Sequence, residues 1–389
     1  MYKLTSRLLL FSDLGGDSIL EELGRIFEAV DNKAMDKDAA THEVYVQIKR
    51  LLDLSTAYGF DGNLWQNYLT FLLVTNENSF TLTAEGDTSD VEADGSVYAF
   101  AKQDFEVFRR LFHYDFYPME QKLGVGCFTR ITDYKALHKR ACLYNRSVSE
   151  TVRALSARLA AAPDADAMFD ILHHHYRTRG VGMFGLNRAF RITNAGGKVE
   201  FLPINNADTV RLSDLVGYEI QKRELVANTK AFAEGKRANN VLLYGDSGTG
   251  KSTSIKAVLN EYYEDGLRMI EIYKHQFRDL SAVIAAIKNR NYRFIIYIDD
   301  LSFEEHEVEY KFLKAVIEGG VETRPENVLI YATSNRRHLI KETWKDRNDM
   351  TQDGDLHRCE TIEEKLSLVN RFGLSIGYFK PSRCEFDDI

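Results

Sequence analysis

The sequence predicts an α/β protein in which a mostly α-helical N-terminal domain precedes a three-layer α-β-α domain built on a parallel sheet. Up to about residue 200, apolar residues recur at helical spacing, as in residues 18–30 and 100–112. Later, short apolar runs alternate with helical stretches, which is typical of parallel strands connected by helices. We therefore place the two domains at residues 1–200 and 201–389.

The composition is that of a globular protein with a large core. The chain has 389 residues, of which 44% are hydrophobic and 28% are charged, and it contains only five prolines. These values argue against a disordered chain, a coiled-coil rod or a long proline-rich linker. The net charge of −8 is not that of a nucleic-acid coat, so DNA is possible as a partner but is not supported by the net charge.

The apolar runs and the cysteines indicate in which compartment of the cell the protein is expected. The longest apolar run near the N-terminus is residues 8–11, which is shorter than the core of a signal peptide, and no run approaches the length of a membrane span. The four cysteines form no C-x-x-C pair and fit no zinc spacing. We expect a cytoplasmic protein with reduced thiols and no membrane contact.

The N-terminal domain is expected to consist mainly of helices. Apolar side chains line one face in residues 18–30, 44–58, 100–112, 150–161 and 167–176. A short strand is expected at residues 79–83. A glycine-containing turn at residues 194–197 then begins a run to Arg211 that reads as a connector between the domains.

The C-terminal domain is expected to alternate strands with helices. Apolar runs predict strands at residues 241–244, 269–272, 294–298 and 328–332. Amphipathic stretches predict helices at residues 252–263, 280–288 and 307–318. Functional side chains are therefore expected where these strands end.

A phosphate-binding loop is predicted after the first of these strands. Residues 245–252 match the pattern G-x-x-x-x-G-K-S/T, in which glycines let backbone N–H groups point at phosphate oxygens. Lys251 would reach the β- and γ-phosphates, and the Ser252 hydroxyl would bind Mg²⁺. The plainer alternative is an ordinary glycine turn between a strand and a helix. The residues expected to hold the nucleotide here are Gly245, Asp246, Ser247, Gly248, Thr249, Gly250, Lys251, Ser252 and Thr253.

Two carboxylates follow the apolar strand at residues 294–298. Beside a phosphate loop, Asp299 is expected to act on the Mg²⁺ side, usually through a water molecule. Asp300 is placed to orient or deprotonate the attacking water, and Glu304 and Glu305 are alternatives for that base. A solvated strand end with acids that cap the next helix would explain the same residues without chemistry.

Two further residues complete the candidate site. Asn335 is one of the polar residues that follow the apolar run at residues 328–332. It can hydrogen-bond both the γ-phosphate and the attacking water, or it can cap the next helix. Arg371 would stabilise transition-state charge at a neighbouring subunit's γ-phosphate. A lone arginine at a helix end can instead be a partner of the helix dipole.

The order of these motifs resembles that of the AAA+ ATPases. The segment Asp214-Leu215-Val216-Gly217-Tyr218-Glu219 looks like the adenine-cradling segment of that superfamily, which implies nucleotide contacts for Val216, Gly217 and Tyr218. Residues 298–303, with Asp300 where many AAA+ proteins have Glu, and residues 371–374 are similar to the clade of replication initiators and helicase loaders.

From about residue 184 to the end, the chain also resembles an uncharacterised bacterial family of predicted ATPases, catalogued as a domain of unknown function (number 815). Residues 184–191, 239–246 and 363–368 carry this resemblance. It implies ATP and Mg²⁺ as cofactors and a homo-oligomer, for which a hexamer is suggested, acting on an unknown protein client. AAA+ modules end in a helical lid with a sensing arginine. Only residues 372–389 follow Arg371, so we expect a truncated lid whose arginine is unassigned.

Three functions remain open from the sequence. The first is an oligomeric ATPase that couples hydrolysis of ATP to remodelling or loading a partner. The second is an ATP-dependent switch or scaffold with little hydrolysis, which Asp300 in the usual Glu position motivates. The third is a P-loop kinase of a small molecule, against which stands the adenine segment upstream of the phosphate loop.

Overall fold

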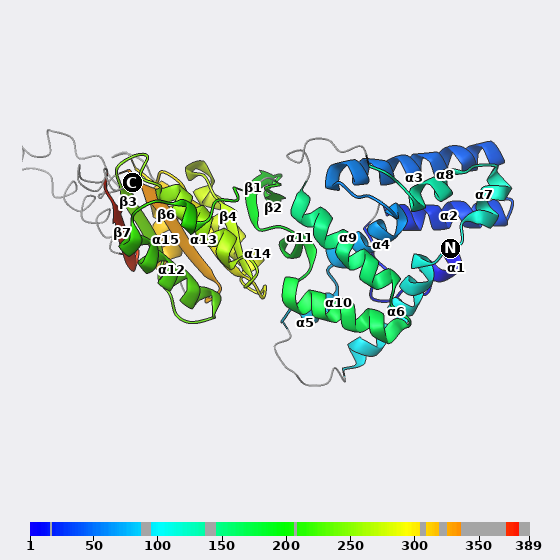
Figure 1. The fold of residues 1–389 in the computed structure, drawn as a ribbon, viewed down its shortest axis with the longest axis horizontal. Coiled ribbons are helices and arrows are strands. Elements are labelled where there is room, and N and C mark those ends of the chain that lie inside the picture. The colour runs from blue at the N-terminus through cyan, green and yellow to red at the C-terminus, as the bar shows by residue number, and fades with distance from the viewer. Residues whose placement is uncertain are drawn as a thin grey trace, which may run out of the picture. The chain divides into compact units, whose positions relative to one another are not determined.

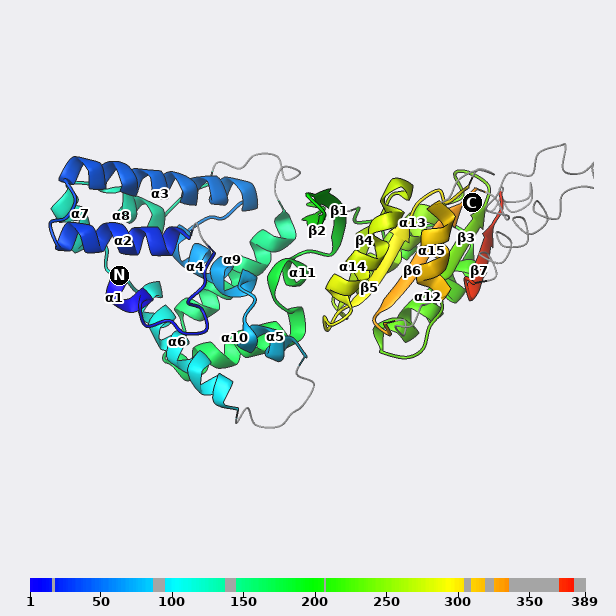
Figure 2. The ribbon, with the colours of Figure 1, turned by 180° about the vertical axis from the view of Figure 1, so that it is seen from behind.

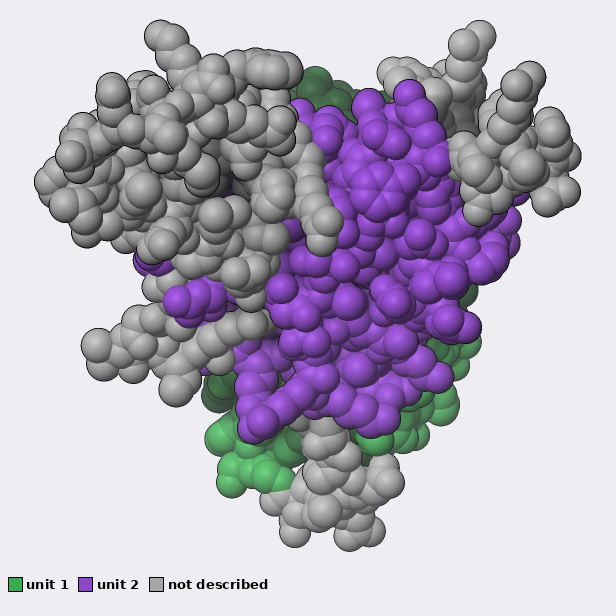
Figure 3. All heavy atoms as spheres, turned by 90° about the vertical axis from the view of Figure 1, so that its left-hand side faces the viewer, with its two compact units in different colours: residues 1–187 green, residues 188–389 purple. Residues whose placement is uncertain are grey.

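A computed structural model describes residues 1–15, 18–86, 95–136, 145–205, 208–303, 309–318, 325–335 and 371–380. The chain divides into two compact units, unit 1 (Met1–Asn187) and unit 2 (Arg188–Ile389), which Figure 3 shows in green and purple. Among the described residues, no helix is both long enough and apolar enough to cross a membrane.

Unit 1 is all-helical in its described part (Figure 1). The five helices predicted here are confirmed as α2, α3, α6, α9 and α10, and several shorter helices add to them. The helices are α1 (Tyr2–Thr5), α2 (Ile19–Asp31), α3 (Lys37–Tyr58), α4 (Leu64–Thr75), α5 (Ser79–Gly86), α6 (Ser96–Phe112), α7 (Tyr117–Leu123), α8 (Cys127–Thr132), α9 (Arg146–Ala160), α10 (Ala165–Arg179) and α11 (Gly182–Leu186).

Aromatic side chains fill the core of unit 1. Trp65 on α4 is buried, its ring meets that of Phe116 edge-on at 5.2 Å, and its Nε1 donates a hydrogen bond to the Leu111 carbonyl at 2.7 Å. Such edge-to-face pairs stabilise a core beyond the area they bury. The Phe- and Tyr-rich sequence of this half therefore serves packing.

The segment that was predicted as a strand at residues 79–83 is helical and forms part of α5. The Asn78 side-chain oxygen accepts the backbone N–H groups of Phe80 and Thr81 at 3.0 and 3.1 Å, which starts the helix. Phe80 and Ala84, four residues apart, are both fully buried on one helix face. Capping and burial outweigh the strand propensity of the β-branched and aromatic residues here.

Unit 2 contains a seven-stranded sheet in the order β2-β1-β4-β5-β6-β3-β7. Every pairing is parallel except that of β1 with β2. The four predicted strands are confirmed as β3 to β6. The strands are β1 (Ala189–Ala195), β2 (Lys198–Pro203), β3 (Val241–Gly245), β4 (Leu267–Glu271), β5 (Arg293–Ile298), β6 (Val328–Ser334) and β7 (Leu374–Tyr378).

Helices cover the sheet on both sides, which gives the predicted three-layer α-β-α architecture (Figures 1 and 2). Side chains of α12 and α13 share one core with alternate residues of the strands, such as Val241 and Leu243 of β3. Intervening residues such as Leu242 face the other side. The helices of this unit are α12 (Glu219–Ala233), α13 (Lys251–Tyr262), α14 (Leu280–Ile287) and α15 (Glu309–Glu318), with 3₁₀ turns η2 (Leu212–Asp214) and η3 (Lys274–Asp279).

The turn predicted at residues 194–197 joins β1 to β2 in a hairpin and does not begin a connector. Gly196 and Gly197 have φ values of 65° and 87°, which only glycine adopts readily. The antiparallel pair runs from Phe190↔Pro203 to Ala195↔Lys198, and β1 also pairs with β4. The domain boundary expected at residue 200 therefore lies inside β2, and the two compact units divide before β1, at residue 187.

Candidate functional site

The phosphate loop runs from the end of β3 to the start of α13, as its sequence predicts. Gly245 has a φ of 133°, and a Cβ atom there would clash with the Tyr378 carbonyl on β7. The backbone N–H of Asp246 donates to that same carbonyl at 2.9 Å. Gly250, with a φ of 85°, precedes the first helical residue. Both glycines are thus required by the backbone path itself.

The strand order brings the other predicted residues to this loop. β6 lies between β5 and β3, so the carboxyl ends of these three parallel strands share one edge of the sheet. Asp299 follows β5, Asn335 follows β6 and Lys251 follows the phosphate loop. Ligand sites of parallel α/β sheets lie at this edge.

Asn335 links the phosphate loop to Asp300. The buried Lys251 ammonium donates to Asn335 Oδ1 at 3.1 Å, and also to the carbonyls of Gly245 and Asp246 at 3.0 and 2.6 Å. Asn335 Nδ2 donates to Asp300 Oδ1 at 2.9 Å. The amide therefore bridges the cation and the proposed base.

Thr333 on β6 hydrogen-bonds both Asp299 and Asp300. The sequence analysis did not identify it as a site residue. Its hydroxyl donates to Asp299 Oδ1 at 2.6 Å and accepts the Asp300 backbone N–H at 3.0 Å. Ser252 Oγ donates to the same Asp299 oxygen at 2.8 Å. The only signal in the sequence was a threonine in an otherwise apolar run, and β-propensity alone explains that residue type.

Burial and neighbouring groups shift the pKa values of Asp299 and Lys251. Partial burial tends to raise the pKa of Asp299, but hydroxyl hydrogen bonds, foremost that from Thr333, hold it below its ordinary value. Burial lowers the pKa of Lys251, and the nearby charges of Asp246, Asp300 and Asp299 act in the opposite direction. Asp299 is therefore ionised at neutral pH.

Asp300 adopts a backbone conformation that few non-glycine residues occupy. Its φ is 49°, in the left-handed region that costs an L-residue roughly 1–2 kcal/mol. The bond from its N–H to Thr333 and the bond from the Leu301 N–H to the Thr333 carbonyl at 2.7 Å hold this turn. Such strain persists where the surrounding structure fixes it, and it is often found at functional sites.

Ser252 and Asp299 could hold a magnesium ion. Hydroxyl and carboxylate oxygens are the hard ligands that Mg²⁺ prefers, and here they already share a hydrogen bond. Within the described ranges, no group of three His, Cys, Asp or Glu residues is placed to hold a metal. A magnesium ion at this position would thus take its other ligands from phosphate oxygens and water.

The segment expected to cradle adenine adjoins the phosphate loop. Tyr218 stacks on Tyr378 at 5.0 Å between ring centroids, and its hydroxyl donates to the Phe379 carbonyl at 2.8 Å. Tyr378 pairs with Gly245 in the sheet. Gly217 has a φ of 78° and Val216 is 61% exposed. An exposed apolar side chain at this place is available for a planar base.

Arg371 is not brought to the phosphate loop of its own chain. It lies three residues before Leu374, which pairs with Val241 at the start of β3, whereas Gly245 at the end of β3 pairs with Tyr378. The length of β7 alone, about 13 Å at 3.3 Å per residue, separates Arg371 from the loop. Glu304 and Glu305, the alternative bases, lie outside the described residues.

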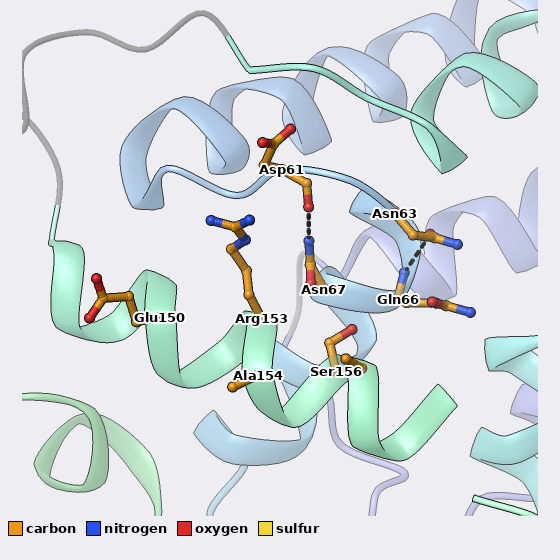
Figure 4. A pocket seen from close by; sticks show the side chains of 9 residues that line it. Asp61, Asn63, Gln66, Asn67, Glu150, Arg153, Ala154 and Ser156 are labelled. Atoms are coloured by element: carbon orange, nitrogen blue, oxygen red, sulfur yellow. Dashed lines mark hydrogen bonds between the residues drawn. The ribbon is translucent and has the colours of Figure 1, made fainter. Parts of the chain in front are cut away.

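A separate polar cavity of about 470 Å³ lies in unit 1 between the start of α4 and α9 (Figure 4). Asn67 donates to the Asp61 carbonyl at 2.9 Å, and the Gln66 N–H donates to Asn63 Oδ1 at 3.0 Å. Arg153 extends from α9 toward the segment that carries Asp61. These amide groups hold the turn into α4.

The three-layer architecture, with a phosphate loop between β3 and α13, gives unit 2 the fold of a P-loop NTPase. The chain belongs to the family described as "Protein of unknown function (DUF815)", whose sequence profile matches residues 186–389. This confirms the family resemblance found in the sequence. No curated protein matches the chain.

Several solved structures are similar to part of the chain. RuvB of Thermotoga maritima, a Holliday junction branch migration motor, is 18% identical with a TM-score of 0.31, over 46% of this chain and 50% of that chain. A point variant of the same RuvB is 17% identical, with a TM-score of 0.32 and the same coverage. DnaI is 19% identical with a TM-score of 0.30, over 45% of this chain and 90% of that one. The chain thus spans about half the length of the RuvB structures.

Proposed function

We propose that unit 2 binds ATP together with Mg²⁺ and hydrolyses it to ADP and phosphate. The observation that carries this proposal is the pair of hydrogen-bonded links that join the phosphate loop to the strand-end carboxylates: Lys251 through Asn335 to Asp300, and Ser252 to Asp299. A structural glycine turn has no need of this set of cation, amide and carboxylates at one edge. Groups of these kinds bind the phosphates, hold Mg²⁺ and orient the nucleophile in phosphoryl transfer.

The binding roles follow from the contacts of each group. The Lys251 ammonium now donates to two backbone carbonyls and to Asn335, and it would exchange these acceptors for phosphate oxygens. Ser252 and Asp299 would hold Mg²⁺, which neutralises phosphate charge when it is bound. Val216, Gly217 and Tyr218 would contact the base.

Hydrolysis would need a base and an orienting group beside the γ-phosphate. Asp300 would take a proton from a water molecule whose oxygen attacks the γ-phosphorus, while the bond from that phosphorus to the bridging oxygen of ADP breaks. The Asn335 amide, 2.9 Å from Asp300, would orient the water. Glu304 stays an alternative for the base.

We further propose that Arg371 acts on the site of a neighbouring copy, which requires a homo-oligomer. Support comes from its exposed position at the sheet edge opposite to its own phosphate loop. A guanidinium supplied from a neighbour stabilises the transition-state charge. An oligomer of this kind, for which a hexamer is the expectation, would use hydrolysis to remodel or load a protein partner.

One contact favours a second candidate, an ATP-dependent switch or scaffold with slow hydrolysis. Asp300 Oδ1 accepts a hydrogen bond from Asn335, and the Asp300 backbone is held in a strained turn. A carboxylate that is engaged in this way is less available as a base. In that case, nucleotide binding alone would change the state of the protein.

Phosphate release and ATP binding, measured on the same variants, test these proposals. Lys251→Ala should lose both, whereas Asp300→Asn should bind ATP but release phosphate about 10²-fold more slowly. Asp265→Asn, at an exposed turn away from the site, is the matched control. Wild-type release in Asp300→Asn would remove Asp300 from the mechanism. Tight binding by the wild type without release would favour the switch.

A further inference from the structure

Two buried tyrosines lie side by side in neighbouring strands of the sheet. Tyr297 on β5 and Tyr331 on β6 are partners in the parallel register, so their side chains leave the same face of the sheet. Both belong to the core that the strands share with α12 and α13, and they are 2% and 0% exposed. A tyrosine hydroxyl at this depth ordinarily has a hydrogen-bond partner, because burying it without one costs free energy.

The Tyr331 hydroxyl is satisfied, whereas that of Tyr297 is not. Tyr331 accepts a hydrogen bond from Asn228 Nδ2 at 3.1 Å and shares another with the Thr229 hydroxyl at 2.9 Å. The Tyr297 hydroxyl is buried and makes no hydrogen bond of acceptable geometry to any described residue. A buried polar atom of this kind calls for an explanation, and a functional role or a bound ion is among the common ones.

The Tyr297 hydroxyl lies beside the candidate magnesium site. The side chains of Ser252 and Asp299 are its polar neighbours. Ser252 and Thr333 both donate to Oδ1 of Asp299, at 2.8 and 2.6 Å. Oδ2 of the same carboxylate is thus left for a further donor, and a carboxylate has acceptor sites on both of its oxygens.

The other acid near Tyr297 is already engaged. Glu271 on β4 is the register partner of Tyr297 on that side, and its Oε2 accepts hydrogen bonds from Arg191 Nε at 2.7 Å and from the Tyr273 hydroxyl at 3.3 Å. Burial, helped by the charges of Asp299 and Glu271, raises the pKa of the Tyr297 hydroxyl far above its ordinary value. The hydroxyl therefore keeps its proton at neutral pH and can donate it in a hydrogen bond.

We propose that Tyr297 is a positioning residue of the magnesium site, and that its hydroxyl donates a hydrogen bond to the Asp299 carboxylate when Mg²⁺ and a nucleotide are bound. This inference rests on the proposed function and adds a residue to its site. Removal of a group that orients a metal-site carboxylate typically weakens metal binding roughly 10–100-fold. Because the hydroxyl forms no hydrogen bond in the folded chain, a bond gained with Mg²⁺ would contribute to metal affinity and not to folding.

Magnesium titrations of nucleotide binding test this role. The binding of AMPPNP, a non-hydrolysable ATP analogue, is followed by isothermal titration calorimetry with EDTA and then at increasing concentrations of Mg²⁺. Tyr297→Phe should raise the Mg²⁺ concentration for the half-maximal effect about tenfold. Its affinity for AMPPNP in EDTA should equal that of the wild type. Its urea midpoint without nucleotide should be no lower than that of the wild type, because the substitution breaks no hydrogen bond.

Tyr331→Phe is the matched control, since it removes the same atom from the register partner of Tyr297. It should lower the urea midpoint, because Asn228 and Thr229 lose a hydrogen-bond partner in a buried place. Its Mg²⁺ dependence should equal that of the wild type. The two substitutions should therefore change different measurements, which a general loss of packing in the sheet would not produce.

Each other outcome overturns an identifiable part of the proposal. A wild-type Mg²⁺ dependence in Tyr297→Phe, or equal shifts in both variants, would overturn the role of Tyr297 and leave the nucleotide site intact. A lower urea midpoint in Tyr297→Phe would show that its hydroxyl is already bonded in the folded chain. Lys251-dependent binding of AMPPNP that does not respond to Mg²⁺ would overturn the magnesium site. A wild type that does not bind AMPPNP would overturn the proposed function, and the role of Tyr297 with it.

Discussion

Two pairs of carboxylates, one pair in each unit, are held in different ways. In unit 1, Asp104 is fully buried and accepts the backbone N–H groups of residues 9–11 at 2.8–3.2 Å, and the buried Glu120 accepts both the N–H and the hydroxyl of Thr129. In unit 2, Asp299 and Asp300 are exposed at strand ends and accept hydrogen bonds from the side chains of Ser252, Thr333 and Asn335.

This difference separates structural acids from candidate functional ones. A buried carboxylate that satisfies several backbone N–H groups has no free oxygen to offer a ligand, and its removal leaves buried donors without partners. An exposed carboxylate held by side chains can change partners when a ligand binds. Substitution of the buried Asp104 or Glu120 should therefore lower stability. Substitution of Asp299 or Asp300 should lower activity.

Among the variants that should still bind ATP, Arg371→Ala is expected to lose the most activity. Loss of an arginine supplied to a neighbour's γ-phosphate should slow ATP hydrolysis about 10³-fold, because transition-state charge loses its partner. The urea midpoint of unfolding should not change, since Arg371 is exposed. Mixing Arg371→Ala with Lys251→Ala subunits should restore part of the rate. Full activity of Arg371→Ala alone would show that no arginine is shared at this position.

Asp104→Ala should lower stability and leave ATP binding unchanged, the reverse of what is expected for Arg371→Ala. Three backbone N–H groups would lose their acceptor in a buried place, which should lower the free energy of unfolding by about 4 kcal/mol. Urea unfolding followed by circular dichroism measures this loss. ATP binding by the folded fraction should be unchanged. A stability equal to that of the wild type would contradict the structural role of this carboxylate.

His175 gives unit 1 a dependence of stability on pH. Burial, helped by the charges of Arg179 and Arg158, lowers its pKa from 6.5 to about 4. As the pH falls from 6.5 to 4, the unfolded chain binds a proton that the folded chain does not, so the free energy of unfolding falls by about 3 kcal/mol. His175→Leu should remove this part of the slope. Parallel pH profiles for the two proteins would refute the assignment.

The smallest effect is expected from Thr333→Val, which removes the hydroxyl but keeps the shape. With Asp299 and Asp300 less well fixed, hydrolysis should fall about tenfold and the concentration of Mg²⁺ for half-maximal rate should rise. Thr333→Ser should recover most of the rate. If valine and serine variants behave alike in a Mg²⁺ titration, the hydroxyl has no positioning role.

The parts of unit 2 that follow from contiguous sequence were predictable. The phosphate loop is eight consecutive residues between a strand and a helix, and Asp299 and Asn335 end apolar runs. The carboxyl ends of parallel strands meet at one edge, so their proximity follows from fold class alone. The strand order then explains why Asn335 lies between Lys251 and Asp300.

Other features depend on tertiary contacts that no local pattern encodes. Thr333 resembles any β-branched residue in a buried strand until β5 is placed beside it. The hairpin of β1 and β2 is stabilised by the pairing of β1 with β4, which is a contact between residues far apart in the sequence. Without that contact, its polar and alternating sequence indicated a connector. The α-helix α5 depends on the Asn78 cap and on burial of Phe80, and its composition alone favoured a strand.

Isothermal titration calorimetry with ATP and Mg²⁺ on the wild type and on Lys251→Ala tests the nucleotide site most directly. The buried Lys251 ammonium is the only cation in the described part of the chain that hydrogen-bonds Asn335. We predict saturable binding by the wild type and an affinity at least 10²-fold weaker for Lys251→Ala, which corresponds to about 3 kcal/mol. Equal affinities in the two proteins, or no binding by the wild type, would contradict a nucleotide site at this edge of the sheet.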